Sequence, residues 1–97
     1  MAILVRPAAA ADIESAFRWY EDQRSGLGEE SLRELQTIIA SLDAHPKQNP
    51  VIHRNARRAL VHRFPYGIFY RIYADDVVVV VCLHARRDPK VWKTRLG

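Results

Sequence analysis

The feature that most constrains the fold is an unbroken run of seven apolar residues, Val77–Leu83, five of which are valine. Seven residues are too few for a helix that buries all its sides, and β-branched side chains favour the pleated backbone of a strand. A strand that is apolar at every position is buried on both of its faces. We therefore predict that Val77–Leu83 is the central strand of a sheet and that Cys82, the only cysteine, is a buried and inert thiol.

The segments before this run predict further strands. Residues 68–73 alternate in side-chain character, and Ala74-Asp75-Asp76 supplies a polar turn, which is typical of a β-hairpin. Residues 57–63 show a similar alternation and predict the strand before that hairpin. The short apolar run Ile3–Val5 ends at Arg6-Pro7, and we expect it to join the free edge of the valine strand.

Two stretches have helical periodicity. The first begins at Ala8 and places its apolar residues on one face, with Trp19 well away from this apolar stripe. Asp12 and Glu14 lie near its start, where we expect them to interact favourably with the positive end of the helix dipole. Gly26-Leu27-Gly28 interrupts the pattern, and a second helix is predicted from Glu29 to His45-Pro46. These two helices form a helical hairpin whose apolar face needs a sheet to cover it.

The predicted fold class is thus α+β, a helical hairpin packed on a small, mainly antiparallel, four-stranded sheet in one domain spanning residues 1–97. The element order is β-α-α-β-β-β, followed by a short C-terminal helical turn in which Val91, Trp92 and Leu96 fall at helical spacing. Residues 51–56 receive no assignment because polar and helix-breaking residues dominate them.

The charges divide unequally along the chain. Residues 1–46 hold four Lys/Arg and eight Asp/Glu, a net charge of −4, whereas residues 47–97 hold eleven and three, a net charge of +8. This asymmetry favours an anionic partner, either nucleic acid or an acidic polypeptide, over two solvated faces that only keep the protein soluble. The first residues contain neither a signal peptide nor a membrane span, so we expect a cytoplasmic protein without membrane contacts.

Few residue patterns point to chemistry. There is no glycine-rich loop followed by lysine, and the four histidines have no familiar metal spacing, so no cofactor and no metal are expected. A cationic set remains, and the predicted strand pairing brings several of its members to one side of the sheet: Arg57, Arg58, His62, Arg63, Arg71, His84, Arg86 and Arg87. Such groups cleave RNA when a base activates the 2′-hydroxyl and arginines stabilise the phosphorane. Solvated side chains without a catalytic role are the favoured alternative, because no specific motif assembles this set.

Several short motifs carry a family resemblance. They are A-x-x-D-I at residues 9–13, Trp19-Tyr20, Gly26-Leu27-Gly28, Arg57-Arg58, F-P-Y-x-I-x-Y at residues 64–70, and H-A-R-R-D-P at residues 84–89 followed by Trp92. In this order and spacing, the chain resembles the ParE branch of the RelE/ParE toxin superfamily along nearly its whole length. The resemblance implies a toxin of a bacterial type II toxin-antitoxin module, inhibited by a cognate antitoxin that contributes an acidic C-terminal segment. It also implies contact with operator DNA only indirectly, through the antitoxin.

The superfamily contains two activities. The RelE branch consists of ribosome-dependent mRNA endonucleases and is similar to this chain at Arg58 and Arg86. It differs at three positions. It has an arginine where this chain has Gly67, a tyrosine where this chain has Trp92, and a second basic residue where this chain has Leu60. An RNase lacking three such groups is expected to be badly impaired. The ParE branch implies binding to DNA gyrase instead.

The resulting hypothesis is a ParE-like toxin that inhibits gyrase. Its predicted surface for the target or the antitoxin consists of Arg57, Arg58, Arg63, Arg71, Arg86, Arg87 and Trp92. One alternative is an RNase using Arg58, Arg86, His62 and His84. Another is a basic binding module whose toxicity has decayed.

Overall fold

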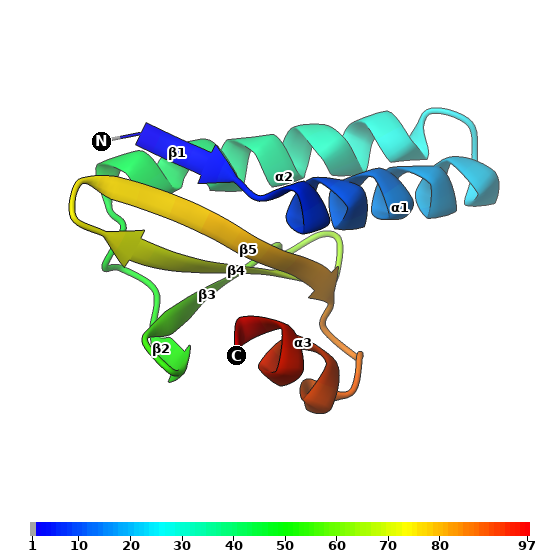
Figure 1. The fold of residues 1–97 in the computed structure, drawn as a ribbon. Helices are drawn as coiled ribbons and strands as arrows, with labels where there is room; N and C mark the ends of the chain where they lie inside the picture. Colours follow the sequence, from blue (N-terminus) through cyan, green and yellow to red (C-terminus); the bar gives the residue numbers. More distant parts are fainter. Residues whose placement is uncertain (1) are drawn as a thin grey trace.

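The computed structural model describes residues 2–97 and has the predicted α+β architecture. The elements are β1 (Ala2–Val5), α1 (Pro7–Gln23), α2 (Leu27–Ala44), β2 (Val51–His53), β3 (Ala56–Leu60), β4 (Tyr66–Tyr73), β5 (Asp76–His84) and α3 (Pro89–Leu96). Helices α1 and α2 run side by side over one face of the sheet, and α3 lies against the other face (Figure 1).

The sheet has the strand order β1-β5-β4-β3-β2, which places the valine strand β5 next to β1 as predicted. β1 is parallel to β5, with Ile3 beside Val77 and Val5 beside Val79. The backbone N–H of Arg6 extends this pairing by donating to the carbonyl of Val79 at 3.0 Å. All other neighbouring strands are antiparallel.

The valine run is buried on both faces because each face of β5 is covered by helices. Val77, Val79 and Cys82 belong to the core under α1 and α2, whereas Val78, Val80, Val81 and Leu83 belong to the core under α3. The strict alternation fails at one bulge, since Phe69 of β4 lies opposite Val81 and Tyr70 lies opposite Val79. Val80 is therefore the extra residue, and the side chains of Val80 and Val81 both reach the α3 side.

The connection between α1 and α2 explains the Gly-x-Gly pattern. Gly26 has φ +87°, a conformation that L side chains rarely adopt, and a Cβ at Gly28 would lie 2.6 Å from the carbonyl oxygen of Phe17. The carboxylate of Glu21 accepts hydrogen bonds from the backbone N–H of Gly26 at 3.1 Å and of Gly28 at 2.9 Å. Gly28 thus lies inside α2, which starts two residues earlier than the sequence predicts.

The sheet has five strands where the sequence predicted four. The additional strand is β2, which forms a tight hairpin with β3 through a turn at Arg54 and Asn55. Both turn residues have positive φ, 45° and 63°, as the hairpin turns that match strand twist require. Arg54 and Asn55, two of the polar residues for which residues 51–56 received no assignment, thus form the turn of this hairpin.

The predicted strand at residues 57–63 ends earlier, at Leu60, so His62 and Arg63 lie in the β3–β4 connection and not on the strand. Phe64 in this connection is buried against the helical side, and Pro65 has no N–H to donate to a ladder. The N–H of Val61 donates to the carbonyl of Tyr66 at 3.0 Å and closes the connection.

The C-terminal helix is a full element and not merely a turn. Asp88 caps α3 by accepting a hydrogen bond from the backbone N–H of Lys90 at 2.9 Å, and Pro89 occupies the first helical position. Val91, Trp92 and Leu96 pack on the sheet, as their helical spacing predicts.

Candidate functional site

The loop from His84 to Asp88, which we call the arginine loop, joins β5 to α3 and has a fixed backbone. The N–H of Ala85 donates to the carbonyl of Pro65 at 2.7 Å, and the N–H of Arg87 donates to the carbonyl of His84 at 3.0 Å. The N–H of Arg86 donates to Nδ1 of the His84 ring at 3.0 Å. These bonds hold the loop so that the side chains of Arg86 and Arg87 are exposed without a carboxylate partner among residues 2–97.

A groove of about 440 Å³ lies beside the arginine loop, between α1, the end of β5 and α3. Trp19 lines it with 56% of its surface exposed, so the tryptophan that the sequence places away from the apolar stripe is indeed uncovered. Tyr66 and His84 contact each other in the same groove, with ring centroids 5.5 Å apart. The groove thus combines an aromatic surface with the guanidinium of Arg87.

An ion pair links three elements at this groove. One carboxylate oxygen of Asp12 accepts from Arg95 of α3 at 2.8 Å, and the other accepts from the backbone N–H of Cys82 at 3.0 Å. The side chains of Arg95 and Asp12 are only 26% and 14% exposed. Helix α1 begins at Pro7, so Asp12 lies beyond its first turn and the predicted interaction with the helix dipole is wrong. Its role is to join α1, β5 and α3.

Burial sets the ionisation of two groups in the groove. It raises the pKa of the Cys82 thiol to about 12, with a smaller contribution from the carboxylate of Asp12. It also raises the pKa of Tyr66 to about 12. Both groups stay protonated at neutral pH, and the prediction that the Cys82 thiol is buried is confirmed.

Three of the predicted surface arginines form contacts within the fold. Arg57 donates to the carbonyls of Lys47 and Asn49 at 3.1 and 2.5 Å, which fixes the α2–β2 connection. Arg63 pairs with Glu30 of α2 at 3.1 Å. Arg71 donates to the carbonyl of Leu96 at 2.8 Å and to that of Arg54 at 3.1 Å, which fixes the end of α3.

The cationic set therefore converges only in part. Arg57 lies opposite Tyr70 of the helix-side core, whereas Arg58 lies opposite Phe69 of the α3-side core, so neighbouring arginines face opposite sides of the sheet. Arg58 and Arg71 share the α3 side, while the side chains of His62 and Arg63 belong to the exposed connection before β4.

Two positions that distinguish the RNase branch are filled by packing contacts. The ring of Trp92 stacks on Phe69 at 4.9 Å and 27°. Gly67 is buried, and a Cβ there would meet Phe69 at 3.1 Å and the side chain of Arg58 at 3.2 Å. An arginine at position 67 thus needs Phe69 and Arg58 to move.

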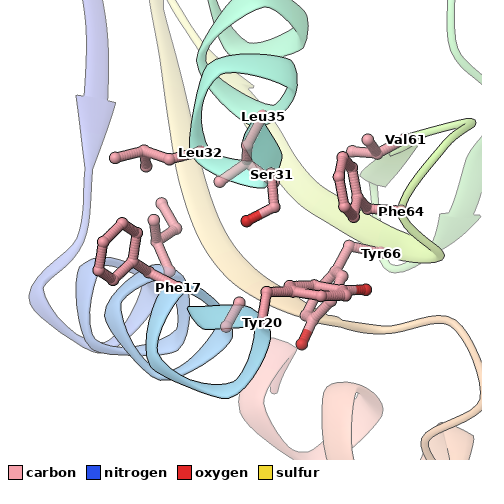
Figure 2. Close-up of a pocket in the computed structure, with 10 residues that line it drawn as sticks. Phe17, Tyr20, Ser31, Leu32, Leu35, Val61, Phe64 and Tyr66 are labelled. Carbon is pink, nitrogen blue, oxygen red and sulfur yellow. The ribbon is translucent and has the colours of Figure 1, made fainter. Parts of the chain in front are cut away.

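The cavity between the helical hairpin and the sheet is too small for a substrate. It is lined by aromatic and aliphatic side chains around Ser31, including Phe17, Tyr20, Leu32 and Phe64, and measures about 10 Å³ (Figure 2). This volume corresponds to roughly one water molecule. The cavity is a packing interface, whereas the groove beside the arginine loop is open.

Within residues 2–97, no group of three or more His, Cys, Asp or Glu side chains is placed to hold a metal ion. None of the helices described combines the length and apolar character needed to cross a bilayer.

Comparison with known proteins identifies a solved structure with the same fold as this chain and a family model that matches its sequence. A solved structure described as the chromosomal ParDE toxin-antitoxin system from P. aeruginosa superposes with a TM-score of 0.81 at 14% identity, over 89% of this chain and 97% of that one. No curated protein matches the chain. The family model described as the ParE toxin of type II toxin-antitoxin systems matches residues 3–89. The chain therefore belongs to the ParE toxin family.

Proposed function

We propose that this toxin inhibits DNA gyrase by protein-protein binding and is neutralised in the cytoplasm by a cognate antitoxin. The observation that carries the proposal is the pair Gly67 and Trp92, which replaces the arginine and tyrosine of the RNase branch. The indole has no hydroxyl for proton transfer, and its ring is engaged with Phe69. Gly67 supplies no cation, and its surroundings leave little room for one.

The arginine loop is the part of the surface best suited to hold a protein target. Its backbone is fixed by three hydrogen bonds, so Arg86 and Arg87 lose little backbone freedom on binding. Their guanidiniums have no carboxylate partner in the described part of the chain and can form charge-assisted hydrogen bonds, and the adjacent groove offers Trp19 as an aromatic anchor. This combination fits an interface with an acidic protein surface better than it fits a small substrate.

Arg86→Ala and Arg87→Ala are expected to weaken toxicity in a growth assay, with the protein still folded. A charge-assisted bond desolvated in an interface contributes about 1.5–3 kcal/mol, which corresponds to a loss of affinity of roughly 10- to 150-fold. Arg18→Ala is the matched control, because Arg18 is exposed on α1 and its ion pair is with Glu14. Equal toxicity of all three variants would exclude the arginine loop from the target interface.

In cells, expression of the toxin should induce the DNA-damage response while mRNA in translating ribosomes stays intact. This experiment tests the function itself, because gyrase poisoning breaks DNA and a ribosome-dependent RNase does not. Intact DNA together with mRNA cut in phase with codons would instead support the RNase that uses Arg58, Arg86 and a histidine.

Neutralisation is tested with the product of the neighbouring open reading frame. We expect a short protein whose apolar anchors cover the helical hairpin and an open strand edge, such as that of β1, and whose acidic C-terminal residues contact the cationic sheet. Co-expression should restore growth and yield a complex that co-purifies. Growth that stays arrested, with no complex formed, would contradict the assignment of that product as the antitoxin.

A further inference from the structure

The β2–β3 hairpin and α3 bring together basic residues that lie outside the arginine loop and its groove. The Trp92 ring lies between them, with the ring of His53 at 6.0 Å and Nζ of Lys93 at 5.6 Å from it. At the hairpin turn, the backbone carbonyl of Arg54 accepts a hydrogen bond from Arg71, and the Arg54 guanidinium forms no hydrogen bond or ion pair with residues 2–97. We call this the hairpin-helix face, and it consists of His53, Arg54, Arg58, Arg71 and Lys93.

Among residues 2–97, no carboxylate forms an ion pair with this face. The side chains of Arg54, Arg58 and Lys93 have no ion-pair partner within residues 2–97, and Arg71 donates only to backbone carbonyls. Burial lowers the pKa of His53, and the charges of Arg54, Lys93 and Arg71 lower it further. Three cations thus act on one imidazole, and this part of the surface has a positive potential.

The opposite face of the molecule is acidic. Helices α1 and α2, which cover the other side of the sheet, carry eight Asp/Glu and only two Lys/Arg (Figure 1). Residues 1–46, which include both helices, have a net charge of −4 and the rest of the chain +8. A polyanion is therefore attracted to the hairpin-helix face and repelled by the helical hairpin.

The aromatic contacts decide which polyanion fits. Proteins that bind single-stranded nucleic acid stack bases on free aromatic rings. Here the Trp92 ring is stacked on Phe69, with Lys93 over the ring and His53 at an edge-on angle of 75°. The face offers charges without a free stacking platform, which suits a duplex whose bases are already stacked and whose phosphates point outward.

We propose that the hairpin-helix face binds the phosphate backbone of duplex DNA, without reading its sequence. Arg54, Arg58 and Lys93 supply the direct contacts, while Arg71 holds the hairpin against α3. This inference goes beyond gyrase inhibition and does not depend on it, because the binding is measured without gyrase. It differs from the contact with operator DNA that the family resemblance implies, which is indirect and made through the antitoxin.

The test is fluorescence anisotropy of a labelled duplex of mixed sequence with the full-length protein, across a salt series. Three phosphate contacts predict a plot of log K against log salt with a slope of about −2.7, since each contributes about −0.9. Combining Arg54→Glu with Lys93→Glu should lower the affinity at least roughly 10-fold and flatten the slope to about −1. The milder pair Arg54→Gln with Lys93→Gln tests the same contacts if reversed charge impairs folding.

A matched control distinguishes the loss of contacts at the hairpin-helix face from the effect of a lower net charge alone. Arg18→Glu combined with Arg33→Glu changes the net charge equally at two exposed positions of α1 and α2, on the other side of the sheet. This control should bind duplex DNA within about twofold of the wild type at moderate salt, where distant charges are screened. The proposal would be overturned if the control pair lost as much affinity, or if the wild type did not bind duplex DNA even at low salt. It would also be overturned if polyglutamate competed as strongly as unlabelled duplex. Tighter binding to a single strand of equal length would overturn it too.

Discussion

Val79→Asp is expected to unfold the domain. Val79 is fully buried in the middle of β5, where it pairs with Val5 on one side and Tyr70 on the other. Burying an unpaired carboxylate among these side chains costs several kcal/mol, while the whole stability of a domain is about 5–15 kcal/mol. The purified protein should lose its cooperative thermal transition, or fail to accumulate, and any loss of toxicity would then report folding alone.

Val51→Asp provides the matched control, because Val51 has the same side chain but is 52% exposed on the edge strand β2. Its free energy of unfolding should change by less than about 1 kcal/mol. Equal urea midpoints for Val79→Asp and the wild type would contradict the placement of β5 at the centre of the sheet.

Asp12→Ala should have the next largest effect on stability. The substitution leaves the guanidinium of Arg95 without its carboxylate and the N–H of Cys82 without its acceptor. Both side chains of the pair are mostly buried, so we expect a loss of about 2–4 kcal/mol in the free energy of unfolding, measured by urea denaturation. Asp12→Asn should lose less, because its amide oxygen can still accept the bond from Cys82.

Glu14→Ala is the control for this pair. Glu14 and Arg18 also form an ion pair, but their side chains are 61% and 73% exposed, so the loss should be under about 1 kcal/mol. A double-mutant cycle with Arg95→Ala should show coupling between Asp12 and Arg95. Equal effects of Asp12→Ala and Glu14→Ala would show that the link between α1, β5 and α3 does not stabilise the fold.

The main elements could be predicted because their signals are local. The valine run, the alternation in residues 68–73 and the two apolar helical faces each follow from neighbouring side chains. What the sequence did not reveal depends on contacts between distant segments. The bulge at Val80 requires the register of β4, and the start of α2 depends on the close approach of Gly28 to Phe17.

The candidate site was less predictable for the same reason. Adjacent residues of a strand face opposite sides of the sheet, so Arg57 and Arg58 could not both join a convergent set. Sequence alone did not show which of the two side chains would form hydrogen bonds within the fold. Asp12 and Arg95 are 83 positions apart, and no local pattern predicts that they pair. Two local signals singled out Asp12: its place near the start of a predicted helix, which suggested the wrong role, and the A-x-x-D-I motif at residues 9–13.

The most direct test of the proposed function is a supercoiling assay with purified gyrase, relaxed plasmid and the purified toxin, run beside a reconstituted translation reaction. We expect the toxin to inhibit supercoiling and to cause cleaved gyrase-DNA complexes to accumulate, while the mRNA stays intact. Codon-phased mRNA cleavage that Arg86→Ala abolishes, together with unchanged supercoiling, would contradict the proposed function.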